Sequence, residues 1–146
     1  MHAIIFDIDH TLFDAEKKLH SGVADLLAIL NRLGYGLAAI SGQDHRAIVR
    51  LDEAGISKYF AHVVCTAQIS EPKALAGITH LLDKMGLKPH QVTMVSHAHS
   101  DILLAKDAGL AKAIGVSHDV TSIEPLQHAG ADIIIEDMPA VLGVVG

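Results

Sequence analysis

Short apolar segments alternate along the whole chain with segments whose apolar residues recur at helical spacing, and this alternation limits the possible folds. The apolar segments predict strands at Ala3–Ile8, Leu37–Ile40, His62–Thr66, Val92–Val95, Ala111–Val116 and Asp132–Ile135. Several are continuously apolar, which is typical of strands buried on both faces. The intervening segments predict helices at Ser21–Leu33, Asp44–Ala54, Pro72–Met85, Ser100–Ala108 and Ile123–His128, and a short one at Pro139–Leu142. This order predicts an α/β fold, a doubly wound, Rossmann-like parallel sheet of about five or six strands flanked by helices.

Composition narrows the class of protein further. A chain of 146 residues, half of them apolar, predicts a single domain over residues 1–146. The formal charge of −6 works against nucleic acid or an anionic membrane as a partner. No apolar run approaches the roughly twenty residues that span a bilayer, and Met1-His2-Ala3 lacks the features of a signal peptide. The lone Cys65 fits a reducing compartment, so a cytoplasmic protein is expected.

Ligands of doubly wound sheets bind outside the carboxyl ends of the strands, so polar residues at those ends are the candidates for chemistry. They are Asp7 and Asp9, Ser41 and Gly42, Thr66 and Ala67, and Ser96 and His97. The pair formed by Asp7 and Asp9 is the strongest signal, because two carboxylates beside an apolar strand are costly unless a positive charge or a metal compensates them. The alternative is that both only cap the turn that follows.

The segment Ile4–Asp14, with Asp7-Ile8-Asp9-His10-Thr11 after an apolar strand, resembles the first motif of the haloacid dehalogenase-like superfamily, Asp-x-Asp-x-Thr. The resemblance extends over nearly all of the chain. It implies that Asp7 is a nucleophile that becomes an aspartyl-phosphate. It also implies that Asp9 is a general acid/base that protonates the leaving oxygen and then activates water. A carboxylate nucleophile splits the displacement into two steps, and a second carboxyl can move the proton.

Two further motifs of the family have counterparts. Ile40-Ser41-Gly42 is similar to the second, in which a hydroxyl and a backbone amide donate to a phosphoryl oxygen, although it also suits the start of the following helix. Lys73 is the candidate for the third-motif lysine, which offsets negative charge on the nucleophile and the phosphoryl group. A strict overlay places Glu71 at that position, and without the family Lys73 is a solvated lysine at a helix start.

Thr93–Ile102 is similar to the fourth motif, in which a hydrophobic strand precedes Gly-Asp, three further residues and a second Asp. Asp101 is present, whereas Ser96 and His97 replace the Gly and the first Asp. Because that Asp helps to bind Mg²⁺ in the family, this is where the chain departs most from its pattern.

The resemblance implies a Mg²⁺ site built from the carboxylates of Asp7 and Asp101 and the backbone carbonyl of Asp9. An imidazole at His97 weakens Mg²⁺ binding and favours Mn²⁺ or Co²⁺, because Mg²⁺ prefers hard oxygen ligands. Of the eleven histidines, only His10, His97 and His99 are expected near this site. The others, His20 and His118 among them, are expected at the surface or at helix edges.

Relatives that enclose small substrates carry a cap domain, inserted after the first motif or between the second and the third. A short stretch separates Thr11 from the first predicted helix, and one helix and one strand fill the interval from Ser41 to Lys73, so no cap is expected. An open site predicts either a large substrate or a homo-oligomer in which a neighbouring subunit covers the site near Asp9 and Ser41.

The leading prediction is therefore a capless, metal-dependent phosphohydrolase that acts on a phosphomonoester, either a small molecule or a macromolecule. The alternative is a weakened or inactive member of the fold that binds a phosphorylated ligand or a protein partner, which Ser96 and His97 favour. A receiver-like domain is disfavoured because its phospho-acceptor and acidic pair come from different strands. A phosphomutase is disfavoured because no cap is expected.

Overall fold

Six parallel strands form one sheet in the order β3-β2-β1-β4-β5-β6. The computed structural model describes residues 2–68 and 73–145, and within them all side chains except those of residues 68, 73 and 74. The strands are β1 (Ala3–Asp7), β2 (Gly36–Ser41), β3 (His62–Cys65), β4 (Val92–Ser96), β5 (Lys112–Val116) and β6 (Ile133–Ile135). The predicted doubly wound parallel sheet is confirmed, and every strand end lies within one residue of its predicted place.

Helices connect consecutive strands, as the sequence predicts. The α-helices are α1 (Val23–Arg32), α2 (Arg46–Glu53), α3 (Lys73–Met85), α4 (His99–Asp107) and α5 (Ile123–His128). Short 3-10 helices are η1 (Ser57–Tyr59), η2 (Thr66–Gln68), η3 (Pro89–Gln91), η4 (Val120–Ser122) and η5 (Met138–Gly143). The helix predicted at Pro139–Leu142 is thus a 3-10 helix, and the other four 3-10 helices are not predicted by the apolar pattern.

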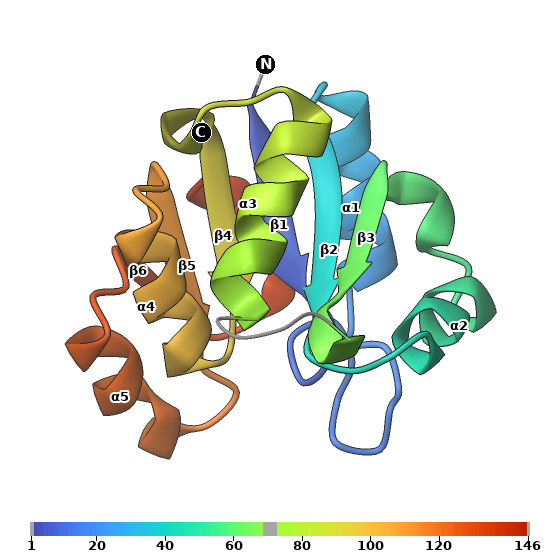
Figure 1. Ribbon diagram of the computed structural model, residues 1–146. Helices are drawn as coiled ribbons and strands as arrows, with labels where there is room; N and C mark the ends of the chain where they lie inside the picture. The colour runs from blue at the N-terminus through green and yellow to red at the C-terminus, as the bar shows by residue number, and fades with distance from the viewer. Residues whose placement is uncertain (1, 69–72, 146) are drawn as a thin grey trace.

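The sheet is covered on both faces because successive residues of its strands point to opposite sides. In β1, Ile4 and Phe6 pack in the cluster that includes residues of α1, α2 and η5. Ala3 and Ile5 pack in the cluster that includes residues of α3, α4 and α5, the helices in front of the sheet in Figure 1. All four side chains are almost completely buried, which explains why β1 is apolar throughout until it reaches Asp7.

Helix α3 lies unusually close to the strands beside it. A Cβ atom added at Gly77 would lie 2.8 Å from Thr66 Cγ2 and 3.0 Å from Ile40 Cδ1. Only glycine permits this approach without displacing the neighbours. The close packing sets the position of α3, whose first residue is Lys73.

The carboxyl ends of the strands meet at the lower edge of the sheet in Figure 1, where a loop follows β1. This loop folds back on itself through an antiparallel bridge between Phe13 and Leu19. The Asp14 carboxylate accepts hydrogen bonds from the backbone N–H groups of Glu16 and Lys18, each at 2.9 Å. Neither the interval from Thr11 to α1 nor the described part of the interval from β2 to α3 holds a cap domain. Over residues 2–68 and 73–145, no helix has the length and apolarity needed to cross a membrane.

Candidate active site

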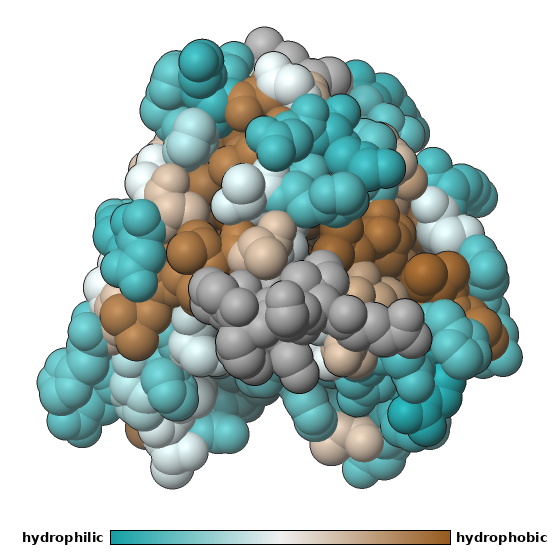
Figure 2. Space-filling view, in the orientation of Figure 1, coloured by the Kyte–Doolittle hydropathy of each residue, from teal (hydrophilic) through white to brown (hydrophobic). Residues whose placement is uncertain are grey.

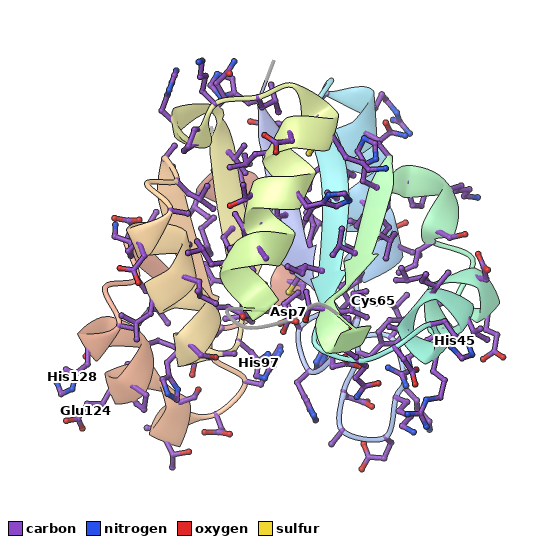
Figure 3. All side chains as sticks on the ribbon, in the orientation of Figure 1. Asp7, His45, Cys65, His97, Glu124 and His128 are labelled. Carbon is purple, nitrogen blue, oxygen red and sulfur yellow. The ribbon has the colours of Figure 1, made fainter. Side chains whose placement is uncertain are left out.

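Asp7 ends β1 at the centre of the sheet edge, and its side chain is only 11% exposed. Its Oδ2 atom accepts a hydrogen bond from Thr11 Oγ1 at 3.0 Å and faces Ser96 Oγ at 3.4 Å. His97 Nδ1 lies 3.0 Å from the same oxygen, and Figure 3 shows Asp7 and His97 together at the lower edge. Strand order explains the cluster: β4 pairs with β1, so the residues that end β4 lie beside Asp7.

The hydrogen bonds around Asp7 assign the proton on His97. Thr11 Oγ1 has one hydrogen, which it donates to Asp7, and it accepts the backbone N–H of His97 at 3.0 Å. His97 Nδ1 therefore faces two acceptors, Thr11 Oγ1 at 3.0 Å and Asp7 Oδ2. Because a carboxylate only accepts, the hydrogen of the ring belongs on Nδ1. In this arrangement His97 is a hydrogen-bond donor to Asp7.

A second carboxylate, Asp101 in the first turn of α4, lies near Asp7, and Ser96 Oγ is close to both. Ser96 Oγ donates to Asp101 Oδ2 at 2.8 Å and accepts the backbone N–H of Ala98 at 3.1 Å. Burial, followed by the nearby negative charge of Asp7, raises the pKa of Asp101 to about 6. The buried Asp7 carboxylate and the partly buried Asp101 carboxyl group thus lie near each other, with Ser96 Oγ close to both; their predicted role as metal ligands stays a prediction.

Asp9 turns toward β2 and α2. Its Oδ2 accepts a hydrogen bond from Ser41 Oγ at 3.0 Å, and its Oδ1 forms an ion pair with Nη1 of Arg50, whose side chain is 14% exposed. Ser41 ends β2 and also accepts the backbone N–H of Gln43 at 3.0 Å. A serine hydroxyl has one hydrogen to donate, so Ser41 donates to Asp9 here and can donate to a phosphoryl oxygen only after it turns.

The other residues predicted at the strand ends or as phosphate ligands differ in exposure and in how much of them the structure describes. Gly42 directly follows β2, is exposed, and has no atom near the place of a Cβ. Thr66 is buried directly after β3 and donates a hydrogen bond to the backbone carbonyl of Ser41 at 3.2 Å, so it helps to hold the end of β2 in place. Lys73 begins α3, but its side chain lies outside the described part of the structure, as does Glu71. The role of Lys73 stays a prediction.

The residues around Asp7 suit a magnesium ion only in part. Asp7, Asp101 and the carbonyl of Asp9 offer hard oxygen ligands, and Mg²⁺ commonly needs only one or two carboxylates from a protein. In the described part of the chain, no three His, Cys, Asp or Glu side chains form a group that could hold a metal. Any ion between Asp7 and position 97 would replace the hydrogen bond from His97, and an imidazole suits Mn²⁺ or Co²⁺ better than Mg²⁺.

The histidines near this edge are more numerous than the sequence predicts. His118 is exposed, as predicted, and His20 is half-buried, but the prediction that the two lie scattered is wrong. Their rings stack with centroids 4.0 Å apart, and both line a cavity that His10 and His97 also line. The rings of His10 and His97 lie 5.3 Å apart. His99 is exposed at the start of α4 and is not among the residues that line this cavity.

Sequence reasoning missed three residues of this region: Arg50, His20 and His118. Arg50 lies in the second turn of α2, well beyond the end of β2, so the rule of strand ends does not select it. The sequence does not distinguish it from Arg46, which lies four residues earlier on the same helix and is 74% exposed. His118 lies two residues after β5, so the rule of strand ends could have selected it. The rule could not have selected its stacking partner, the loop residue His20.

The parallel order with β1 at the centre, and the acidic pair that follows β1, define an α/β protein with its site at the carboxyl edge of the sheet. Residues 14–109 match the family model of haloacid dehalogenase-like hydrolases, which is more than half of the chain. The chain therefore belongs to the haloacid dehalogenase-like hydrolase family, and the resemblance inferred from the motifs is confirmed.

Individual relatives agree with this assignment. The chain is 27% identical over 129 residues to "Phosphoglycolate phosphatase" of Vibrio parahaemolyticus, a match covering 87% of this chain and 56% of that protein. It is 32% identical over 137 residues to "Probable phosphatase IndB" of Dickeya dadantii, covering 92% of this chain and 59% of that protein. The chain thus spans somewhat over half the length of these curated relatives.

A solved structure shares the fold over its full length. The structure of a haloacid dehalogenase-like family hydrolase from Streptococcus pneumoniae superposes with a TM-score of 0.86 at 17% identity. The match covers 100% of this chain and 99% of that one, so the two chains have nearly the same extent.

Proposed function

We propose that the protein is a metal-dependent phosphohydrolase that cleaves a phosphomonoester through an aspartyl-phosphate on Asp7. The observation that carries the proposal is the buried Asp7 carboxylate at the end of β1, held by Thr11, Ser96 and His97 and followed by the separately held Asp9. Relatives with phosphatase names support the same class of reaction.

In the proposed mechanism two carboxylates act in turn, Asp7 as the nucleophile and Asp9 as the acid and base. Oδ1 of Asp7, for which no hydrogen bond is found among the described residues, attacks phosphorus while the bond to the leaving oxygen breaks, and Asp9 gives that oxygen its proton. Asp9 then takes a proton from water, which attacks phosphorus and releases phosphate and the Asp7 carboxylate. Because Asp9 now pairs with Ser41 and Arg50, it must turn toward Asp7 to do this.

Ser41, Gly42 and Lys73 are proposed to bind the phosphoryl oxygens, since a hydroxyl, an exposed amide and an ammonium are suitable donors. Asp7, the carbonyl of Asp9 and Asp101 are proposed to hold Mg²⁺. If His97 turns inward as a fourth ligand, Mn²⁺ or Co²⁺ is favoured. A bound divalent ion would neutralise negative charge on the phosphoryl group and on Asp7.

A second candidate function has a specific observation in its favour. His97 donates directly to Asp7 Oδ2, and Ser96 donates to Asp101 with its Oγ 3.4 Å from Asp7 Oδ2, so protein groups already occupy the space between the carboxylates. A member of the fold that binds a phosphorylated ligand or a protein without turnover would need no more than this.

The test is Asp7→Asn, assayed on a panel of phosphomonoesters with Mg²⁺, Mn²⁺ and Co²⁺. An amide is nearly isosteric but a poor nucleophile, so hydrolysis should fall by a factor on the order of 10³ or more with the fold retained. The control is Asp25→Asn at an exposed position of α1. Activity of Asp7→Asn close to that of the wild type would remove Asp7 from the mechanism. A wild type inactive with every metal would favour the second candidate.

A further inference from the structure

A cavity of about 580 Å³ opens beside the candidate active site, between the loop that follows β1 and the segment that follows β5. Among the described residues, its lining includes four histidines and three acidic residues: His10, His20, His97 and His118, and Asp14, Glu16 and Asp119. The volume falls within the range of small-molecule sites, roughly 300–1,000 Å³. Figure 2 shows the surface notched at this lower edge of the molecule.

The cavity and the proposed nucleophile share His97. One edge of the ring lies 3.0 Å from Asp7 Oδ2, and the same side chain lines the cavity. A phosphomonoester with its phosphorus at Asp7 therefore has this cavity next to it. The phosphoryl-binding residues proposed above, Ser41 and Gly42, are not among the lining residues, so the cavity remains available for the alcohol part of the substrate.

Aromatic rings form much of the cavity wall. The rings of His20 and His118 are nearly parallel, at 22°, with centroids 4.0 Å apart, and His10 and His97 form a second, tilted pair. His20 Nε2 is buried without a hydrogen-bond partner, the single such side-chain atom among the described residues. Buried polar atoms rarely lack a hydrogen-bond partner. Because the described residues give His20 Nε2 none, we expect a ligand in the cavity to supply one. Flat rings favour a flat ligand that stacks on them.

The charges around the cavity select against an anionic ligand. Three of the lining residues carry carboxylates, Asp14, Glu16 and Asp119, and no lysine or arginine is among the described lining residues. Burial, followed by the neighbouring His20, lowers the pKa of His118, which favours its uncharged form. A leaving group with its own carboxylate would face like charge here without a cation to balance it.

We propose that this cavity is the leaving-group site, and that the preferred substrates are phosphomonoesters of uncharged aromatic or heteroaromatic alcohols. The proposal rests on the phosphohydrolase function proposed above. It separates this chain from relatives named for phosphoglycolate, whose alcohol part is a small anion.

The first experiment compares two substrates that differ by one carboxylate, benzyl phosphate and 4-carboxybenzyl phosphate. We expect kcat/KM to be about tenfold higher for benzyl phosphate. Glu16→Gln removes one of the three lining carboxylates, so the ratio of the two kcat/KM values should fall. We expect a fall of only about twofold, because Glu16 is exposed and its charge is partly screened. Glu124→Gln, an exposed residue of α5 that does not line the cavity, should leave it unchanged. Equal kcat/KM values for the two substrates would overturn the proposal.

A second variant tests the stacked wall. His118→Ala should raise KM for benzyl phosphate about fivefold, since one aromatic partner is lost. It should leave kcat/KM for methyl phosphate, which is too small to reach the cavity wall, unchanged. His80→Ala, exposed on α3, is the control and should change neither. A loss of the same size for both substrates would mean that His118 does not bind the leaving group.

Binding without turnover separates this proposal from the function on which it rests. Benzylphosphonate, which cannot be hydrolysed, should shift the ring resonances of His20 and His118 in an NMR titration of the wild type. If these shifts occur in a protein that hydrolyses no phosphomonoester, the cavity assignment holds and the phosphohydrolase function fails. If hydrolysis occurs and the two rings do not respond, the cavity assignment fails alone.

Discussion

In the alignment proposed from the motifs, His97 takes the place of a carboxylate of the family's fourth motif, and its Nδ1 atom lies 3.0 Å from Asp7 Oδ2. We expect His97→Asp to strengthen Mg²⁺ binding by roughly tenfold and to raise Mg²⁺-dependent turnover. The variant supplies a hard oxygen ligand and a second negative charge at a place that already touches Asp7. Calorimetric titration of the wild type and the variant with Mg²⁺ measures the difference.

His99→Asp is the matched control for this change. It introduces the same charge two residues further on, at an exposed position that starts α4. His99→Asp should leave Mg²⁺ affinity nearly unchanged, because surface charge is screened. If His97→Asp behaves like the control, position 97 lies outside the metal shell and the alignment of the fourth motif is wrong.

Arg50 is expected to position Asp9, because its guanidinium pairs with Oδ1 and Ser41 holds Oδ2. Arg50→Gln should lower kcat for benzyl phosphate by about tenfold, the loss of one charged hydrogen bond. For p-nitrophenyl phosphate the loss in the phosphorylation step should be smaller, because that leaving group needs little protonation. Single-turnover kinetics with both substrates measure this difference.

Arg46→Gln serves as the control for Arg50. Arg46 lies one helical turn earlier on α2, and its side chain is 74% exposed and pairs with Asp44 instead of Asp9. It should leave the rates of both substrates unchanged. A rise in KM alone for Arg50→Gln, with kcat preserved, would instead assign Arg50 to substrate binding.

The sequence locates some of these residues and not others for a physical reason. Asp7, Ser41 and His97 lie at or just after strand ends, and parallel strands bring their carboxyl ends to one edge. Arg50 reaches Asp9 from inside a helix, and which side of a short helix faces the site depends on packing that no local pattern contains. The stack of His20 on His118 joins two loops distant in the chain, so it follows from the fold as a whole.

Gly77 allows α3 to pack against β2 and β3, and its replacement should be destabilising despite the better helix propensity of alanine. A Cβ atom would lie 2.8 Å from Thr66 Cγ2, which is closer than such atoms can approach. We expect Gly77→Ala to lower the free energy of unfolding by about 1–2 kcal/mol, since the overpacking cost exceeds the gain of propensity. Urea denaturation of the wild type and the variant measures it.

A second substitution tests whether the contact with Thr66 is the cause. Thr66→Ser removes Cγ2 and keeps the hydroxyl that donates to the Ser41 carbonyl. In the double variant, the cost of Gly77→Ala should shrink by about 0.5–1 kcal/mol. Additive effects of the two substitutions would mean that the strain lies elsewhere, for example at Ile40.

Secondary structure was predictable where a single physical cause dominates. β1 and β4 are mostly apolar because both of their faces are covered by helices, so their ends follow from composition to within one residue. The 3-10 helices η1, η3 and η4 depend on a few local hydrogen bonds, such as Ser122 N–H to the Asp119 side chain, and leave no periodic signature. The same holds for the hairpin that Asp14 organises.

The strand order explains why one edge collects the candidate residues. β1 lies between β2 and β4, so Asp7 has Ser41 on one side and Ser96 on the other. Asp9 turns to the β2 side, where Arg50 holds it, and the histidine-lined cavity opens on the β4 and β5 side. In the proposed mechanism, Asp9 turns toward Asp7 to reach the leaving oxygen, while the rest of the leaving group extends into the histidine-lined cavity.

No cap domain covers the candidate active site in the described part of the chain, and this leads to a prediction about the oligomeric state. We expect a homo-oligomer in which a neighbouring copy covers the region near Asp9 and Ser41. Helix α2 delivers Arg50 to Asp9 and leaves Ile48 39% and Val49 46% exposed beside it, so a copy that covers Asp9 would contact these apolar side chains. Light scattering should then give a multiple of the chain mass of 15.5 kDa.

Val49→Glu should shift this assembly to the monomer, because a carboxylate buried in an apolar contact is costly. Val120→Glu is the control: Val120 is 82% exposed and lies beyond β5, on the other flank of the sheet from α2. It should leave the mass unchanged. Loss of assembly in Val49→Glu should also raise KM for a small substrate, since the neighbour no longer shields the site. A wild type that is monomeric at assay concentration, with full activity on benzyl phosphate, would contradict the prediction.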